Sequence, residues 1–253
     1  MQLNFQCHGD GFPLLILHGL LGSLDNWQNI SRKLGETFRV CAVDLRNHGR
    51  SPHSDAFNYE VMADDLLEFM GTQQIGRAHL LGHSMGGKAA MHFALRHPEK
   101  VEKLVVVDMA PRAYAPTHVP IFDAMLSLDT GSFRERGEID RALATRIPDA
   151  ATRQFLLKNL TRNEQGALQW KPNLPAIRKN YDGLNEALDT NGSFKGPALF
   201  IKGAKSDYIT KNDQALIMSM FPNATISEIH QAGHWVHADA PGEFTELVTN
   251  FLS

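Results

Sequence analysis

Ser84 lies at the centre of a glycine-flanked pentapeptide, Gly82-His-Ser-Met-Gly86, which follows an apolar run and precedes a stretch that favours a helix. A serine on a tight turn between a strand and a helix presents its hydroxyl above the sheet, and glycines two residues away on either side leave room for neighbouring backbone. The spacing therefore predicts a nucleophilic serine. A match of this composition arises by chance in roughly one chain in ten, so the prediction depends on the strand–turn–helix setting as well as on the motif.

A serine hydroxyl needs a base before it can attack a carbonyl carbon. His234, in Ala232-Gly-His-Trp235, lies between the last predicted strand and the last predicted helix, where an imidazole can reach the serine. Asp108 ends the apolar run 101–107, and Asp207 follows the run 197–201. The chain order serine, acid, histidine suits a nucleophile on this kind of turn. From the residues alone, either aspartate can orient His234, and either can instead accept hydrogen bonds from loop amides.

Backbone amides are the predicted donors to the negative charge that forms during acyl transfer. The amide of Met85, directly after the serine, is one candidate, and the amide of Leu20 in the loop 18–23 is the other. Gly19 allows this loop to turn sharply, and His18 is expected to orient the loop. Residues near the ends of the motifs are the candidates for contact with a substrate: His18, Gly19, Leu21, Trp27, Asn47, His48 and Trp235. The two tryptophans fit the core equally well.

Short apolar runs alternate with amphipathic stretches along most of the chain. Largely continuous apolar runs of four to seven residues are typical of strands buried on both faces of a parallel sheet. They predict strands at 13–17, 38–43, 78–81, 101–107, 197–201 and, more weakly, 225–230, with an antiparallel edge strand at 3–7. Helices are predicted at 25–34, 59–71, 85–96, 211–219 and 241–252. This order indicates an α/β fold with a mostly parallel central sheet and helices on both faces.

The alternation stops between residues 112 and 192. Prolines close the preceding unit, and helix-favouring pieces follow at 121–129, 133–146, 149–160 and 175–189, with no convincing strand among them. An insertion between two parallel strands lies at the carboxyl edge of the sheet, where ligands bind. We therefore expect one domain over 1–253, with a helical cap inserted at 112–192.

Composition excludes several classes of protein. The chain has 253 residues, 43% of them hydrophobic, which is typical of a globular domain and not of a disordered chain. Its 25 lysines and arginines against 28 acidic residues give a net charge of −3, so a nucleic-acid partner is not expected. No apolar run reaches the ~18 residues of a membrane span, and the first residues do not resemble a leader peptide. We expect a cytoplasmic protein whose two cysteines, Cys7 and Cys41, are buried free thiols.

Metal and nucleotide chemistry is not expected either. The pairs His234 and His237, or His48 and His53, lack a third ligand at suitable spacing. Lys88 follows two glycines but lacks the earlier glycine of a phosphate-binding loop, so we expect it on the surface of its helix. No cofactor is predicted.

Five segments together resemble the α/β-hydrolases, and most closely the YbfF-type bacterial esterases: 18–26, 44–54, 82–88, 107–111 and 232–239. The resemblance implies a serine carboxylesterase with a small-molecule acyl ester as substrate, with thioesters as a further possibility, and a monomer or weak homo-oligomer. It favours Asp108 as the acid, because that family carries its aspartate in the Val-Asp-x-x-Pro segment and tends to lack an acid at the position of Asp207. This chain has both aspartates, so Asp207 remains the alternative.

Two other readings of the same motifs are open. Related caps and triads hydrolyse carbon–carbon bonds or support perhydrolysis, whereas dehalogenation is disfavoured because it requires a carboxylate nucleophile. The fold can also serve as a non-catalytic receptor for a ligand, although no residue of the motifs is disabled.

Overall fold

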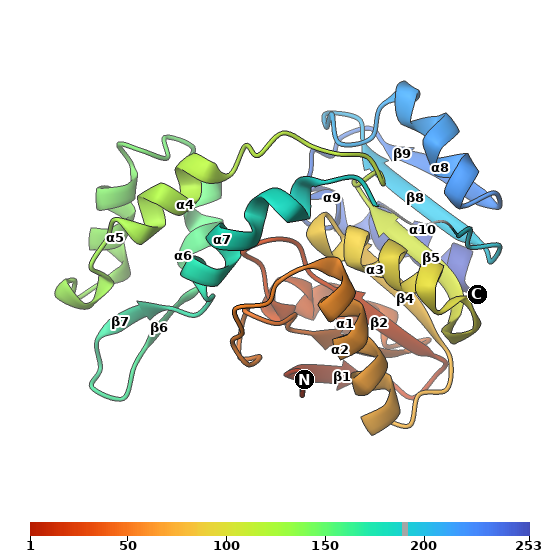
Figure 1. Ribbon diagram of the computed structural model, residues 1–253, viewed down its shortest axis with the longest axis horizontal. Coiled ribbons are helices and arrows are strands. Elements are labelled where there is room, and N and C mark those ends of the chain that lie inside the picture. The colour runs from red at the N-terminus through yellow and green to blue at the C-terminus, as the bar shows by residue number, and fades with distance from the viewer. Residues whose placement is uncertain (189–191) are drawn as a thin grey trace.

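The computed structural model describes residues 1–188 and 192–253, and its centre is a seven-stranded sheet (Figure 1). The strand order is β1-β3-β2-β4-β5-β8-β9. Strand β1 pairs antiparallel with β3, and the other neighbours are parallel. The strands are β1 (Phe5–His8), β2 (Pro13–Leu17), β3 (Arg39–Val43), β4 (Ala78–His83), β5 (Val101–Val107), β8 (Ala198–Gly203) and β9 (Ala224–Ile229). The predicted α/β fold, with its mostly parallel sheet, is confirmed.

Helices cover both faces of the sheet because side chains alternate along each strand. On β2, Leu15 and Leu17 pack with α2 (Tyr59–Thr72) and α3 (Met85–Arg96), while Leu14 and Ile16 pack with α1 (Gln28–Leu34) and α10 (Pro241–Leu252). The sheet thus separates two apolar cores. Helix α8 (Gln214–Met220) joins the first core, and the short helix α9 (Val236–Asp239) joins the second. No helix among the described residues is long and apolar enough to cross a membrane.

The segment between β5 and β8 forms the inserted part of the chain, and Figure 1 shows most of it to the left of the sheet. It contains α4 (Val119–Leu126), α5 (Arg136–Leu143), α6 (Ala150–Leu157) and α7 (Leu174–Asn185), shorter than the predicted helical pieces. The prediction that it lacks strands was wrong, because β6 (Leu160–Arg162) and β7 (Leu168–Trp170) form an antiparallel hairpin. Three-residue strands are too short to give a period-two signal. Residues 189–191, at the end of the last predicted helical piece and of the predicted cap, lie outside the described residues.

The two cysteines are joined by a disulfide, so the prediction of free thiols was wrong. Cys7 on β1 is directly opposite Cys41 on β3, with their Cα atoms 4.1 Å apart. The prediction of free thiols was wrong because an edge strand was expected at 3–7 but the strand that pairs with it was not identified. Once β1 pairs with β3 in this register, the two side chains lie on the same side of neighbouring strands and meet.

Candidate active site

Three predicted residues meet at the carboxyl edge of the sheet. Ser84 follows β4, Asp108 follows β5, and His234 lies in the loop between β9 and α9. The Nε2 atom of His234 is 3.1 Å from the Ser84 hydroxyl oxygen, and its Nδ1 atom is 2.7 Å from Oδ2 of Asp108. Parallel strands that end at one edge bring residues from distant parts of the sequence into a single hydrogen-bonded chain.

The turn at Ser84 has the strained geometry that its motif predicts. Ser84 has a φ of 54°, in the left-handed region that residues with a side chain rarely adopt. A Cβ atom on Gly82 would lie 2.1 Å from the carbonyl oxygen of Gly86, and one on Gly86 would lie 2.4 Å from that of Leu17. Only glycine fits at these two positions, which is why the turn can pass so close to β2. Helix α3 begins at the next residue, Met85, and directs its positive end toward the serine.

Asp108 is held in place by several donors besides the imidazole. Its side chain is fully buried, and its Oδ1 atom accepts a hydrogen bond from the Gly203 amide at 3.2 Å. The Ser206 hydroxyl donates to Oδ2, the same oxygen that faces His234. Asp108 also has a φ of 49°, which turns the chain sharply after β5. The carboxylate is thus oriented toward His234 by groups from the end of β8 and from the loop that follows it.

The other candidate acid, Asp207, is exposed and lies at the edge of a cavity beside Ser84. Its backbone carbonyl oxygen accepts a hydrogen bond from Arg112 at 3.1 Å. Both ring nitrogens of His234 are already engaged, by Ser84 and by Asp108. In this structure the hydrogen-bonded chain therefore runs through Asp108 and not through Asp207.

Neighbouring rings fix the orientation of His234. The Tyr208 ring stacks on the imidazole, with 3.9 Å between the ring centroids and 19° between the planes. The Nε2 atom of the buried His83 lies 2.9 Å from the backbone carbonyl oxygen of His234, so this nitrogen carries a proton and donates it.

Because a carboxylate only accepts hydrogen bonds, the contact with Asp108 puts the His234 proton on Nδ1. Nε2 is then free to accept the proton of the Ser84 hydroxyl.

Two backbone amides beside Ser84 are available as donors. Within the described residues, neither the Leu20 amide nor the Met85 amide donates a hydrogen bond. The Met85 amide belongs to the first turn of α3, where N–H groups have no acceptor within the helix. Gly19 packs against the serine turn, since a Cβ atom there would be 2.9 Å from Nδ1 of His83 and 3.3 Å from Cβ of Ser84. This arrangement can hold a developing oxyanion.

Two buried histidines shape the loop that carries Leu20. His18 Nδ1 donates to the Gly19 carbonyl oxygen at 2.8 Å, and its Nε2 accepts from the Leu45 amide at 3.0 Å. His48 Nε2 accepts from the amide of Leu21 at 3.1 Å, and Leu21 has a φ of 57°. Both imidazoles are neutral, and both form hydrogen bonds with backbone groups. These hydrogen bonds of His18 support the prediction that it orients the loop, which stays a prediction.

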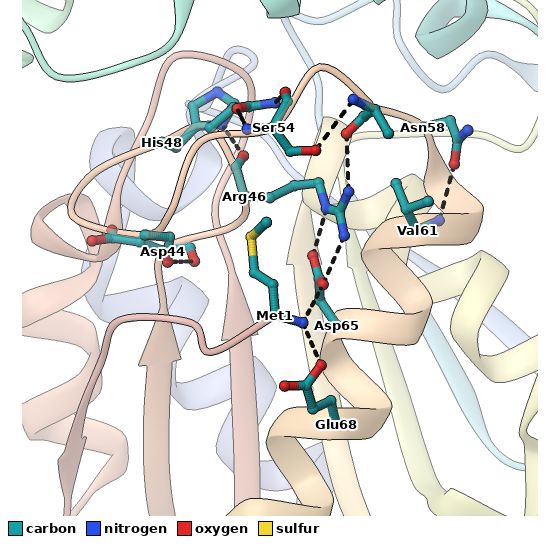
Figure 2. Close-up of polar contacts among 12 residues, drawn as sticks. Met1, Asp44, Arg46, His48, Ser54, Asn58, Val61, Asp65 and Glu68 are labelled. Atoms are coloured by element: carbon teal, nitrogen blue, oxygen red, sulfur yellow. Dashed lines mark hydrogen bonds and ion pairs between the residues drawn. The ribbon is translucent and has the colours of Figure 1, made fainter.

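The loop that carries His48 is in turn fixed to α2 (Figure 2). The Arg46 guanidinium makes two bonds with Asp65 on α2, from Nε to Oδ2 at 2.6 Å and from Nη2 to Oδ1 at 2.7 Å. Both side chains are buried, and the amino group of Met1 also donates to Asp65. Asp44 accepts from the Leu24 amide at 2.8 Å and so connects the same loop to the chain beyond Leu20. These contacts connect the chain just beyond Leu20, through the loop that carries His48, to a buried ion pair with α2.

Two cavities meet at Ser84, and Leu20, Ser84 and His118 line both of them. We call them the lysine-side cavity, of about 300 Å³, and the tryptophan-side cavity, of about 420 Å³. The first is also lined by Tyr59, Met85, Lys88, Tyr114, Tyr181 and Tyr208. The second is also lined by His18, Gly19, Leu21, Trp27, Phe155, His234 and Trp235. Most of the predicted contact residues thus surround the serine.

Asn47 and His48 are exceptions, because they are outside the linings of both cavities. The buried Asn47 side chain bonds the backbone of Ser54, accepting from its amide at 2.8 Å and donating to its carbonyl oxygen at 2.9 Å. The Asn47 carbonyl oxygen accepts from the Asn173 amide, at the start of α7. Asn47 fixes the loop to the inserted segment, and its contact with a substrate stays a prediction.

Lys88 corrects another expectation. It was predicted on the surface of its helix, but its side chain is 1% exposed and lines the lysine-side cavity. Its position four residues after Ser84 is the signal that the prediction passed over, because residues four apart lie on one face of a helix. The cavity tyrosines Tyr59 and Tyr114 carry no such local signal.

The buried histidines predict an acid-sensitive fold. Burial lowers the pKa of His18 to about 4, and it lowers the pKa values of His48 and His237 to about 3. In the unfolded chain these groups bind a proton near pH 6.5, so between pH 6.5 and 4 the unfolded state holds more protons than the folded state. Their contribution to the free energy of unfolding is therefore complete above pH 6.5 and is lost as the pH falls, by about 1.4 kcal/mol per histidine per pH unit.

Urea unfolding at pH 7.5 and pH 5.5 measures this effect above the range in which most carboxylates titrate. We expect a clearly lower midpoint at pH 5.5, with an unchanged slope against urea. Equal midpoints at the two pH values would contradict the burial of neutral histidines.

The described residues contain no group of three side chains arranged to hold a metal ion. His237 stacks on Trp27 with 4.1 Å between the ring centroids, and His53 bonds the backbone carbonyl oxygen of Lys171. The two pairs considered above were His234 with His237 and His48 with His53. Among the described residues, neither pair belongs to a group of three possible metal ligands. The groups that meet at the candidate site are the Ser84 hydroxyl, the His234 imidazole, the Asp108 carboxylate and the nearby backbone amides.

The fold and this arrangement define an α/β-hydrolase. A family model described as the alpha/beta hydrolase fold matches residues 13–241, so the chain belongs to that family. The chain is 34% identical to esterase YbfF of Escherichia coli (strain K12) over 259 residues, which cover 100% of each protein. It is 38% identical to the sn-1-specific diacylglycerol lipase ABHD11 of Danio rerio over 98% of this chain and 80% of that protein. The resemblance to the YbfF-type esterases is confirmed.

The solved structures give the same result. A marine microorganism esterase has 44% sequence identity with this chain and a TM-score of 0.97, with 99% of each chain covered.

Proposed function

We propose that this enzyme hydrolyses short acyl esters through a covalent acyl-enzyme on Ser84, with His234 as the base and Asp108 as the acid that orients it. The chain is a carboxylic ester hydrolase, as the names of its relatives from Escherichia coli and from the marine microorganism indicate. The observation that carries the mechanism is the continuous chain from Ser84 through His234 to Asp108, with contacts of 3.1 Å and 2.7 Å at the junction of two cavities.

The reaction has two halves. His234 Nε2 takes the hydroxyl proton as the Ser84 oxygen bonds to the ester carbonyl carbon, and the amides of Leu20 and Met85 donate to the resulting oxyanion. When the carbon–alkoxy bond breaks, His234 returns the proton to the departing alcohol. Water then attacks the acyl-enzyme with His234 again as base, and the acid product leaves with Ser84 restored.

The position of His234, the proton donor, indicates which half of the ester would occupy which cavity. The departing alcohol must be within reach of Nε2 of His234, and His234 lines the tryptophan-side cavity. The alcohol half therefore occupies that cavity, and the acyl half occupies the lysine-side cavity. A volume of about 300 Å³ is at the small end of the range for ligand sites, which favours short acyl groups.

The inserted segment is proposed to act as the cap over this site. His118 and Tyr181 from the segment line the lysine-side cavity, and His118 also lines the other one. Phe155 on α6 packs against Trp235, with 5.5 Å between the ring centroids. The cap thus supplies walls to both cavities, so it helps to determine which esters fit.

A panel of substrates tests the proposed function. We expect kcat/KM for 4-nitrophenyl esters to be highest for short unbranched acyl chains and to fall steeply once the acyl chain exceeds the lysine-side cavity. Thioesters of the same acyl groups, a vinylogous diketone and hydrogen peroxide as an acyl acceptor complete the panel. Hydrolysis of the diketone without turnover of any ester would contradict the proposal.

A further inference from the structure

Lys88 is a buried cation beside the nucleophile that the reaction described above does not use. It lies on α3 one helical turn after Ser84, its side chain is 1% exposed, and both residues line the lysine-side cavity. Its Nζ atom donates to the carbonyl oxygen of Glu186 at 2.5 Å. The rings of Tyr114 and Tyr59 lie 5.1 Å and 5.9 Å from the same atom, measured to their centroids.

The ammonium group lacks an acidic partner in the part of the chain that the structure describes. Among the described residues no carboxylate lies within 4 Å of Nζ, and the lysines that form ion pairs there are Lys33, Lys171 and Lys202. Glu186 and Asp207 carry the nearby carboxylates, and both residues are exposed. A buried cation is normally paired with an anion, because removing it from water is costly. One carbonyl and two ring faces compensate for part of this cost, and within residues 1–188 and 192–253 only one of the three N–H donors has a hydrogen-bond acceptor.

We propose that Lys88 is a specificity-determining residue that binds a negatively charged group on the acyl half of the substrate, so that monoesters of dicarboxylic acids are preferred over uncharged esters of equal length. This inference rests on the proposed function, in which the acyl half occupies the lysine-side cavity. A carboxylate at the far end of the acyl chain would accept the two free N–H groups of Lys88 in charge-assisted hydrogen bonds. The tyrosine rings and the apolar wall would enclose the chain between that carboxylate and Ser84.

A second cation lies close to the same cavity. The Arg112 guanidinium stands over the Tyr114 ring, 4.0 Å from its centroid, and pairs with Asp213 at 2.9 Å. Asp213 compensates for the charge of Arg112, whereas Lys88 has no acidic partner in the described part of the chain. The anion-binding role is therefore assigned to Lys88.

Matched pairs of esters test the proposal in the whole enzyme. The mono-4-nitrophenyl esters of glutaric and adipic acid are compared with 4-nitrophenyl pentanoate and hexanoate, and the rates without enzyme are subtracted. We expect the charged ester to have the higher kcat/KM in at least one pair. Lys88→Met should lower the ratio of charged to uncharged kcat/KM by on the order of 10- to 100-fold, the usual effect of losing a buried charge-assisted hydrogen bond.

Lys103→Met is the matched control. The Lys103 Nζ atom also donates to backbone carbonyls, those of Phe251 and Leu252, and also lies over an aromatic ring. It is not among the residues that line either cavity. The control should leave the ratio of charged to uncharged kcat/KM as it is in the wild type.

The outcomes separate this inference from the proposed function. Hydrolysis of both esters with no preference for the charged one would overturn the role of Lys88 and leave the esterase mechanism standing. An equal loss for both esters in Lys88→Met would assign Lys88 a structural role and also overturn the inference. Turnover of neither ester by the wild type would overturn the proposed function, and this inference with it.

The pH profile of the wild type gives a readout that needs no variant. Burial and the Arg112 charge lower the pKa of Lys88 to about 8, against the opposing influence of Glu186. Above this pH the amine is neutral, so the ratio of charged to uncharged kcat/KM should fall as the pH rises through about 8. The ratio cancels the pH dependence of the acyl-transfer steps, which both esters share. A ratio that is constant from pH 7 to pH 9.5 would contradict the proposal.

The tyrosines and histidines around Lys88 have pKa values displaced away from that range. Burial raises the pKa values of Tyr59, Tyr114, Tyr181 and Tyr208, so these side chains stay neutral. Burial lowers the pKa of His118 to about 4 and also lowers that of His92 on α3, so both are neutral above pH 7. The other charged residues near Lys88 are Arg112, which stands over the Tyr114 ring, and the exposed Glu186 and Asp207.

Discussion

Replacing Ser84 with alanine is expected to lower kcat for short acyl esters by on the order of 10⁶, the loss found when the nucleophile of a serine triad is removed. Ser84 supplies the atom that bonds to the acyl carbon, and none of the groups around it can take that role. His234 and Asp108 then have no alcohol to activate, and the Leu20 and Met85 amides can only polarise a bound ester. Steady-state assays with 4-nitrophenyl butyrate measure the effect.

A structural control is needed because Ser84 sits at a strained turn. Its φ of 54° is held by the glycines on either side, and its hydroxyl bonds only His234 among the described residues. Ser84→Ala should therefore keep the thermal midpoint of the wild type within a few degrees. A variant that folds normally and retains more than about a hundredth of the wild-type kcat would show that Ser84 is not the nucleophile.

Asp108→Asn is expected to lower kcat by on the order of 10⁴, because an amide that donates toward Nδ1 stabilises the wrong tautomer of His234. The Nε2 atom would then carry the proton and could no longer accept the one on Ser84. KM should change far less than kcat, since Asp108 is fully buried and does not line either cavity.

Asp207→Asn is the matched comparison, as it removes the same charge from an exposed position one residue after Ser206. We expect kcat to change by less than about threefold, because the contacts of His234 are with Asp108 and Ser84. The reverse order, with a large loss for Asp207→Asn and a small one for Asp108→Asn, would assign the acid role to Asp207. Equal and mild losses would mean that neither aspartate orients the histidine.

Local patterns in the sequence predicted most of the fold. The runs at 13–17 and 101–107 match β2 and β5 residue for residue, since strands buried along most of their length are largely continuous apolar segments. Helix α3 was predicted at its observed bounds, 85–96, because the motif at Ser84 fixes its start. The hairpin of β6 and β7 was not predicted, as three-residue strands carry too little periodicity. The disulfide was not predicted either, because it depends on which strands become neighbours.

The candidate site likewise contains residues that local sequence patterns indicated and residues that they did not. Ser84, His234 and Leu20 could be found because each is next to the end of a predicted strand, and parallel strand ends converge. The choice between Asp108 and Asp207 could not be made from the residues, because both occupy such an end and only the path of the backbone determines which one faces the imidazole. Lys88 was misplaced because a lysine is assumed to be exposed unless its surroundings are known.

The most direct test of the reaction centred on Ser84 is the site of covalent labelling by a fluorophosphonate, located by peptide mass spectrometry. The probe reacts with a serine only when a base takes its proton and amides stabilise the oxyanion. We expect one adduct per chain, on the peptide that contains Ser84, no adduct in Ser84→Ala, and labelling that is slower by orders of magnitude in His234→Ala. Labelling at another residue, or a wild-type enzyme that hydrolyses esters while Ser84 stays unmodified, would contradict the proposed mechanism.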